Sequence, residues 1–191
     1  MEPRLVLASA SPRRARILDS LGVPFRVAVP AVEESLLPAE EASSAVVRLA
    51  RAKAEAAARS ESLPVLAADT LVVCDGRILG KPASADEAAA MLRRLAGRTH
   101  EVITGLCLSA GGVARSGVER SAVTFAPMTE AEVAWYVATR EPMDKAGAYH
   151  LEGRGALFVT SVSGSPSNVA GLPVRLVLLL AREAGLALGM P

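Results

Sequence analysis

Residues 65–79 read VLAADTLVVCDGRIL, and this stretch decides the fold class. Residues 65–68 form a compact apolar run, which predicts a central β-strand that ends at Asp69. Apolar residues then lie on both sides of Asp75-Gly76, a dipeptide typical of a two-residue hairpin turn. A hairpin beside a central strand breaks the strict strand–helix–strand alternation of an all-parallel sheet. The stretch therefore predicts a sheet with both parallel and antiparallel neighbours.

Helix and strand patterns alternate on both sides of this stretch. Ser11-Pro12 opens a helix, and Ser84 and Thr129 each begin a capping box. The remaining expected elements are strands at 4–8, 25–29, 101–108 and 156–162, a helix at about 43–60, a turn at Gly111-Gly112 into another strand, and a final helix from Pro173. The sequence therefore predicts an α/β fold with a mixed sheet flanked by helices, rather than a Rossmann fold or a barrel.

Length and composition limit the number of domains, the make-up of the core and the possible binding partners. A chain of 191 residues is the size of one domain, here 1–191, or of one domain with two lobes around a cleft. Apolar residues make up 51% and aromatic residues only 3%, so the core is built from Ala, Val and Leu. A net charge of +1 with so few aromatic rings argues against nonspecific nucleic-acid binding.

No targeting or membrane-spanning segment is recognisable. The apolar stretch at residues 5–10 is too short for a signal-peptide core, and the run at 176–181 is too short to cross a membrane. The two cysteines suit a reducing compartment, and the two histidines do not have zinc-site spacing. We therefore expect a cytoplasmic protein that does not bind membranes.

The segment Ser9-Ala-Ser-Pro-Arg13-Arg14 is a candidate phosphate site. It stands where a strand passes into a helix, and free N–H groups at a helix start attract phosphate oxygens. Hydroxyl and guanidinium groups add further donors. An ordinary capped helix with exposed arginines is an equally good interpretation of this segment alone.

Three further residues, Lys53, Asp69 and Lys81, can form a functional site only if the fold brings them together. Lys53 lies within the apolar stripe of its helix, where it is either paired or extends along the edge of the stripe. Asp69 could be a metal ligand, a general base or a turn residue. Lys81 follows Gly80 but lacks the spacing of a phosphate-binding P-loop. With Glu33 as a second carboxylate, this set could hold a divalent cation and a polyphosphate, which phosphoanhydride cleavage requires.

Ordered motifs extend over nearly the whole chain: LASASPRR at 7–14, VEE at 32–34, RLARAKA at 48–54, AADTLV at 67–72, ILGKP at 78–82, LAGRTHEVITG at 95–105, DKAGAY at 144–149 and NVAGLP at 168–173. In these motifs the chain resembles the Maf family of nucleoside triphosphate pyrophosphatases. The resemblance implies an elongated fold shared with ITPase-like enzymes, a central cleft, a homodimer, and hydrolysis of a nucleoside triphosphate with Mg²⁺ or Mn²⁺. It implies that Asp69 accepts the proton and that Ser9, Arg13, Glu33, Lys53 and Lys81 are polar active-site residues. Together with the chemistry of the residues, this leads us to expect that Glu33 and Asp69 hold the metal and that the substrate is bound by Ser9, Arg13, Arg14, Lys53, Thr70, Lys81 and Glu152.

The resemblance also bears on substrate preference, through three discriminating positions, 13, 70 and 152, and the neighbouring residue 150. Arg13 and Thr70 resemble the family branch that acts on dTTP and UTP, whereas the 7-methyl-GTP branch typically has tryptophan and glutamine there. Glu152 and His150 depart from the glutamine and glycine usual in the dTTP/UTP branch. An ionised glutamate only accepts hydrogen bonds, so it suits the paired N–H donors of guanine better than glutamine does. We expect dTTP and UTP hydrolysis with a broadened or shifted base preference. The alternatives are a 7-methyl-GTP or modified-purine pyrophosphatase, and a nucleotide-sensing regulator of septum formation.

Overall fold

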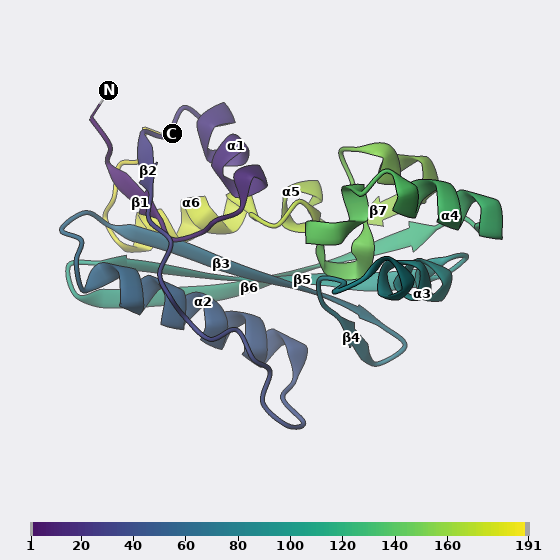
Figure 1. Cartoon of the computed structure of the whole chain (residues 1–191). Helices are drawn as coiled ribbons and strands as arrows, with labels where there is room; N and C mark the ends of the chain where they lie inside the picture. Colours follow the sequence, from purple (N-terminus) through teal and green to yellow (C-terminus); the bar gives the residue numbers. More distant parts are fainter. Residues whose placement is uncertain (1, 190–191) are drawn as a thin grey trace. The chain divides into compact units, whose positions relative to one another are not determined.

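A computed structural model describes residues 2–189 and divides the chain into two compact units (Figure 1). Within the described residues, unit 1 comprises residues 2–69, 104–119 and 171–189, and unit 2 comprises Thr70–Ile103 and Arg120–Ala170. Each unit is assembled from separate stretches of chain, because three long strands begin in one unit and end in the other.

The sheet is mixed, as the hairpin at residues 75–76 predicts. Within the described residues it has seven strands in the order β2-β1-β3-β5-β6-β7, with β4 paired to β3. β1 runs parallel to both β2 and β3, whereas the β3–β4 and β6–β7 pairs are antiparallel. The strands are β1 (Leu5–Leu7), β2 (Phe25–Val27), β3 (Val65–Cys74), β4 (Arg77–Leu79), β5 (Thr99–Ala110), β6 (Val113–Phe125) and β7 (Val159–Ser163).

The helices begin where the sequence places their caps. The side chains of Ser11, Ser84 and Thr129 each accept a backbone N–H three residues on, and Thr129 completes the expected capping box with Glu132. The α-helices are α1 (Pro12–Ser20), α2 (Ala42–Ala58), α3 (Ala85–Leu95), α4 (Glu130–Ala138), α5 (Pro166–Val169) and α6 (Val174–Glu183), with 3₁₀ turns η1 (Glu141–Asp144), η2 (Ala146–Ala148) and η3 (Arg154–Phe158). No helix of the described residues is long and apolar enough to cross a membrane.

In unit 1, successive strand residues point to opposite faces of the sheet, and each face packs against different helices. Leu5, Leu7 and Leu66 share a buried cluster with residues of α1 and α6. Val6 and Val65 instead share a cluster with the alanines of α2. Figure 1 shows α2 on one side of these strands and α1 and α6 on the other. Residues of odd number from 65 to 69 therefore face α2.

The fit of α2 against the sheet depends on a glycine. A Cβ built on Gly105 would lie 2.4 Å from the carbonyl carbon of Val46 and 2.5 Å from its oxygen. Because these are backbone atoms of α2, no side-chain movement could relieve the overlap. Gly105 thus lets the helix backbone approach β5 directly.

In unit 2, one buried cluster joins α3 and α4 to the sheet and to the turns that follow α4. It includes Leu92 from α3, Tyr136 from α4, Phe125 from β6 and Phe158 from η3. Tyr149 packs edge-on against Phe125, with ring centroids 4.8 Å apart. Few as they are, the aromatic residues concentrate in this cluster, whereas unit 1 is filled mainly by aliphatic side chains.

Two of the expected strand limits are wrong. The strand that begins at Val65 does not end at Asp69 but continues to Cys74, so Asp69 and Thr70 lie in the strand interior. A polar residue is tolerated there because Asp69 finds a charged partner on α2. The strand expected at 156–162 begins only at Val159, because residues 154–158 form η3 around Gly155.

Candidate functional site

Two of the candidate site residues, Lys53 and Asp69, are in direct contact within unit 1. Asp69 follows Val65 and Ala67 on the face of β3 that packs against α2, and Lys53 lies in the buried stripe of α2. Lys53 Nζ donates to Asp69 Oδ1 at 2.6 Å. Each residue is only 7% exposed. Two buried opposite charges sixteen residues apart are thus held as a pair, and Asp69 is not a turn residue.

A second carboxylate reaches the same lysine. Lys53 Nζ lies 3.0 Å from Glu34 Oε1, and the Glu34 side chain is 55% exposed. The acidic pair after Val32 therefore contributes its second member to this cluster, while the neighbouring Glu33 is exposed on the same loop. Two carboxylates that contact one nitrogen lie next to each other, as ligands of a shared cation would.

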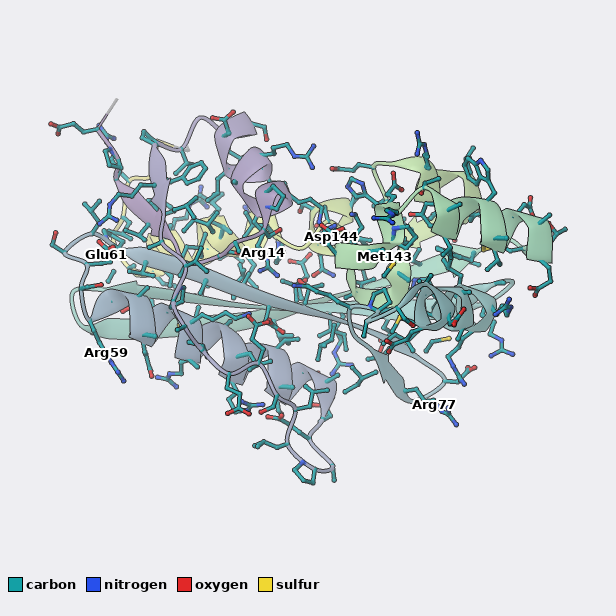
Figure 2. The ribbon with its side chains drawn as sticks, in the orientation of Figure 1. Arg14, Arg59, Glu61, Arg77, Met143 and Asp144 are labelled. Atoms are coloured by element: carbon teal, nitrogen blue, oxygen red, sulfur yellow. The ribbon has the colours of Figure 1, made fainter. Side chains whose placement is uncertain are left out.

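The Ser9–Arg14 segment forms an internally bonded turn at the start of α1. Ser9 Oγ accepts the Ser11 N–H at 3.2 Å and Arg14 Nη1 at 3.1 Å. Arg14 Nε donates to the Gly171 carbonyl at 2.8 Å. Figure 2 labels Arg14 in the first turn of α1. Arg14 therefore orients the Ser9 hydroxyl and ties α1 to the chain that precedes α6.

The electrostatics place Arg14 with the other charged residues of unit 1. Burial lowers the pKa of Arg14; Asp69 and Glu34 act to raise it, and Arg13 acts to lower it further. Each of these charges is close enough to affect the Arg14 guanidinium. Unit 1 therefore brings together Arg13, Arg14 and the Lys53–Asp69–Glu34 cluster.

Three predicted substrate residues lie in unit 2. Thr70 follows Asp69 in β3 and is half-buried, whereas Lys81 and Glu152 are exposed on loops. The loop before Lys81 is fixed by its neighbour, since the Gly147 N–H donates to the Gly80 carbonyl at 3.1 Å. These three residues remain predicted site residues on the strength of the sequence.

A metal would find carboxylate oxygens in unit 1. Within the described residues, no group of three or more His, Cys, Asp or Glu side chains forms a ready-made metal cage. Asp69 and Glu34 supply two hard oxygen donors around one cationic position. This donor set fits an ion such as Mg²⁺, which usually takes one or two protein carboxylates and completes its shell with water and substrate phosphates.

Sequence reasoning missed a polar network in unit 2 that involves Tyr136 and Glu141. Tyr136 is fully buried, and its hydroxyl donates to Glu141 Oε1 at 2.8 Å. Glu141 also accepts the backbone N–H groups of Arg154 and Gly155. The only sequence signal is the pair of glycines at 153 and 155, which marks a close backbone approach without saying to what.

Sequence reasoning also missed His100, which is buried beside Tyr149. His100 Nε2 and the Tyr149 hydroxyl lie 3.0 Å apart, and the two rings meet edge-on. Burial lowers the pKa of His100 to about 4, so its imidazole is neutral at physiological pH. This histidine belongs to the core of unit 2 rather than to a metal site.

The fold and the motifs agree with comparisons to known proteins. The family model for Maf-like proteins matches residues 4–184. A protein of Anaeromyxobacter sp. (strain Fw109-5) named dTTP/UTP pyrophosphatase is 50% identical over an alignment of 187 residues, which covers 95% of this chain and 90% of that protein. A protein of Symbiobacterium thermophilum with the same name is 46% identical over 183 residues, 95% of this chain and 94% of its own length.

Solved structures extend the likeness to the fold alone. The Ham1 protein of Staphylococcus aureus aligns with 94% of this chain and 98% of its own, with a TM-score of 0.55 and 16% sequence identity. At that identity the likeness shows a shared architecture and says nothing about the functional site.

Proposed function

The chain belongs to the Maf family, and from this we propose that it is a nucleoside triphosphate pyrophosphatase that hydrolyses dTTP and UTP to the monophosphate and pyrophosphate. The observation that carries the proposal is the buried contact between Lys53 and Asp69 with Glu34 beside it. Removing two opposite charges from water costs free energy that their attraction offsets only in part, which makes a buried pair of this kind a candidate for a functional site. The names of the two relatives supply the substrate class.

Asp69 is the proposed proton acceptor. Its contact with Lys53 uses Oδ1, which leaves Oδ2 to accept a proton from an attacking water. The ion pair also fixes the carboxylate against rotation, so the acceptor oxygen is oriented before substrate binds. Water attacks the α-phosphate directly, so no covalent enzyme intermediate forms.

The cationic residues are proposed to bind the triphosphate. Arg13, Lys53 and Lys81 neutralise charge that develops on the pyrophosphate leaving group, as the family resemblance implies. The Ser9 hydroxyl, held by Arg14, donates to a phosphate oxygen. Arg14 keeps its predicted place in the substrate site, and the structure adds that its guanidinium also positions Ser9.

A divalent cation, Mg²⁺ or Mn²⁺, is the proposed cofactor. Asp69 and Glu34 or Glu33 would hold it through carboxylate oxygens, with the triphosphate completing its shell. When bound, such an ion polarises phosphoryl oxygens and neutralises their charge. Glu34 would supply its carboxylate to such an ion from the position in which it now contacts Lys53.

Base preference is proposed to depend on Arg13, Thr70 and Glu152. The first two favour dTTP and UTP, and Glu152 widens the preference toward purine bases, because its carboxylate can accept two N–H donors. A 7-methyl-GTP or modified-purine activity is therefore the second candidate, and Glu152 alone favours it. A cytoplasmic location and a homodimer remain predictions from the sequence and from the family resemblance.

Pyrophosphate release from a panel of dTTP, UTP, CTP, GTP, 7-methyl-GTP and ITP, with and without EDTA, tests the proposal. We expect hydrolysis of dTTP and UTP that EDTA abolishes, and a fall of at least about a hundredfold in kcat for Asp69→Asn. Glu119→Gln, an acidic residue of β6 outside the cluster, is the matched control and should retain full activity. Retained turnover in Asp69→Asn would remove Asp69 as the base, and release of single phosphates would replace the proposed reaction with another.

A further inference from the structure

The segment that carries Glu152 is held by two side chains far from it in sequence. The buried Tyr136 hydroxyl accepts the His150 N–H at 3.0 Å and donates to Glu141 Oε1. Glu141 in turn accepts the N–H of Arg154 at Oε2, at 3.1 Å, and the N–H of Gly155 at Oε1, at 3.0 Å. The chain is thus bonded two residues before Glu152 and again two and three residues after it.

The glycines of this segment show how close the backbone comes to these two side chains. A Cβ on Gly153 would lie 2.6 Å from Glu141 Oε2, and a Cβ on Gly155 would lie 2.6 Å from the Tyr136 hydroxyl. Real Cβ atoms do not approach so closely, so a side chain at Gly153 would displace the Glu141 carboxylate, and one at Gly155 would also meet the His150 carbonyl oxygen at 2.7 Å. The glycines at 153 and 155 therefore allow residues 150–155 to approach the Glu141 carboxylate and the Tyr136 hydroxyl closely enough for hydrogen bonds.

The negative charge of Glu141 suits a residue that accepts several hydrogen bonds. Burial acts to raise its pKa, but the hydrogen bonds from Tyr136 and from the two backbone amides outweigh burial and lower the pKa. The group is an anion that accepts three N–H or O–H donors. Glu141 is the first residue of η1, the turn that follows α4, and Figure 2 labels Met143 and Asp144 of this turn.

We propose that Glu141, together with Tyr136, is a positioning residue that fixes residues 150–155 and thereby sets the place of the Glu152 side chain, on which base selection depends. The inference rests on the proposed role of Glu152 in reading the base. Glu152 is exposed and makes no ion pair within the described residues, so its backbone is what holds it in place. A shift of that backbone changes which bases the carboxylate can reach, whereas the Lys53–Asp69 contact in unit 1 is unaltered.

The test measures kcat/KM for dTTP and for GTP and follows their ratio. In Glu141→Gln an amide N–H₂ replaces one accepting oxygen and opposes a backbone N–H, so we expect the ratio to change about tenfold, the effect of one lost hydrogen bond. Tyr136→Phe keeps the buried ring and removes only the hydroxyl, so it provides the same test if Glu141→Gln folds poorly. The change should appear mainly in KM, with kcat for dTTP retained.

Glu132→Gln is the matched control, because this glutamate of α4 also accepts a backbone N–H but caps its own helix at Thr129. It should lower stability without moving the ratio. In a Glu152→Ala background, Glu141→Gln should have no effect on the ratio. An equal effect with and without Glu152 would overturn the inference, as would an unchanged ratio in both Glu141→Gln and Tyr136→Phe.

The experiment separates two failures. If Glu152→Ala changes the base ratio and the Glu141 and Tyr136 variants do not, the positioning role is wrong and the proposed base reader stands. If Glu152→Ala leaves the ratio unchanged, the premise about Glu152 fails and the positioning role fails with it. Pyrophosphate release itself tests the reaction class independently of both.

Discussion

Replacing Asp69 by asparagine should destabilise the protein as well as inactivate it. The substitution keeps the side-chain shape but removes one charge of the buried Lys53–Asp69 pair. Loss of one partner of a buried ion pair typically costs about 3–5 kcal/mol, because the other charge is left without compensation. Here Glu34 still contacts Lys53 from a half-exposed position, so we expect a loss at the lower end, about 3 kcal/mol.

For a chain of this length, a loss of that size lowers the melting temperature by roughly 6–12 °C. Differential scanning calorimetry of Asp69→Asn against the wild-type protein measures it. Glu34→Gln is the matched control: its carboxylate is half-exposed, so its loss should cost about 1 kcal/mol or less. The double variant Lys53→Met/Asp69→Asn should lose less stability than the sum of the two single variants. If Asp69→Asn melts no lower than Glu34→Gln, the contact is not the buried ion pair that we describe.

Three further perturbations test other parts of the structure. Gly105→Ala should cost about 3 kcal/mol in urea unfolding, because its Cβ would meet the backbone of Val46; an unchanged midpoint would mean that α2 does not approach β5 as described. The pKa of His100 is lowered by burial to about 4, below its unfolded value of 6.5, so protonation favours unfolding and stability is lost as the pH falls from 6.5 toward 4. His100→Gln should remove about 2 kcal/mol of the loss between pH 7 and pH 5, and parallel pH profiles for the two proteins would contradict this. Arg14→Lys keeps the charge but loses the two guanidinium hydrogen bonds that join Ser9 to Gly171, so kcat/KM for dTTP should fall about tenfold. Full activity of this variant would mean that Arg14 contributes only its charge and does not position Ser9.

Local chemistry made much of the fold predictable. The caps at Ser11, Ser84 and Thr129 begin helices because a side-chain oxygen and the free N–H groups three residues on are neighbours in sequence. The turn at Asp75-Gly76 forms with φ near +49° and +71°, the left-handed backbone that this dipeptide favours. These features need no knowledge of the distant chain.

The limits of β3 could not be predicted from local chemistry. A polar Asp69-Thr70 pair after an apolar run indicates a strand end unless a partner neutralises the acid, and that partner is on another element. The Lys53–Asp69 contact itself could not be predicted, because periodicity placed Lys53 in a buried stripe without showing which residue it faced.

The hydrogen bonds that Glu141 accepts from the backbone at residues 154 and 155 could not be predicted from the sequence. It consists of bonds from a side chain to backbone N–H groups, and backbone groups carry no residue identity. Short 3₁₀ turns also lack the periodicity that marks α-helices, so residues 141–158 offered only glycines as guides. The choice of Glu34 rather than Glu33 as the contact of Lys53 depends likewise on loop geometry that a run of two glutamates does not reveal.

The interruption of β3, β5 and β6 by unit boundaries constrains how this protein can diverge. A gene fragment that encodes residues 70–170 also encodes residues 104–119, which belong to the other unit, so no single cut yields one unit intact. Recombination that moved only one unit between relatives would therefore place residues from two parents within each of three strands of one hydrogen-bonded sheet. A point substitution such as the one at Glu152 changes a single loop side chain and leaves those strands as they are.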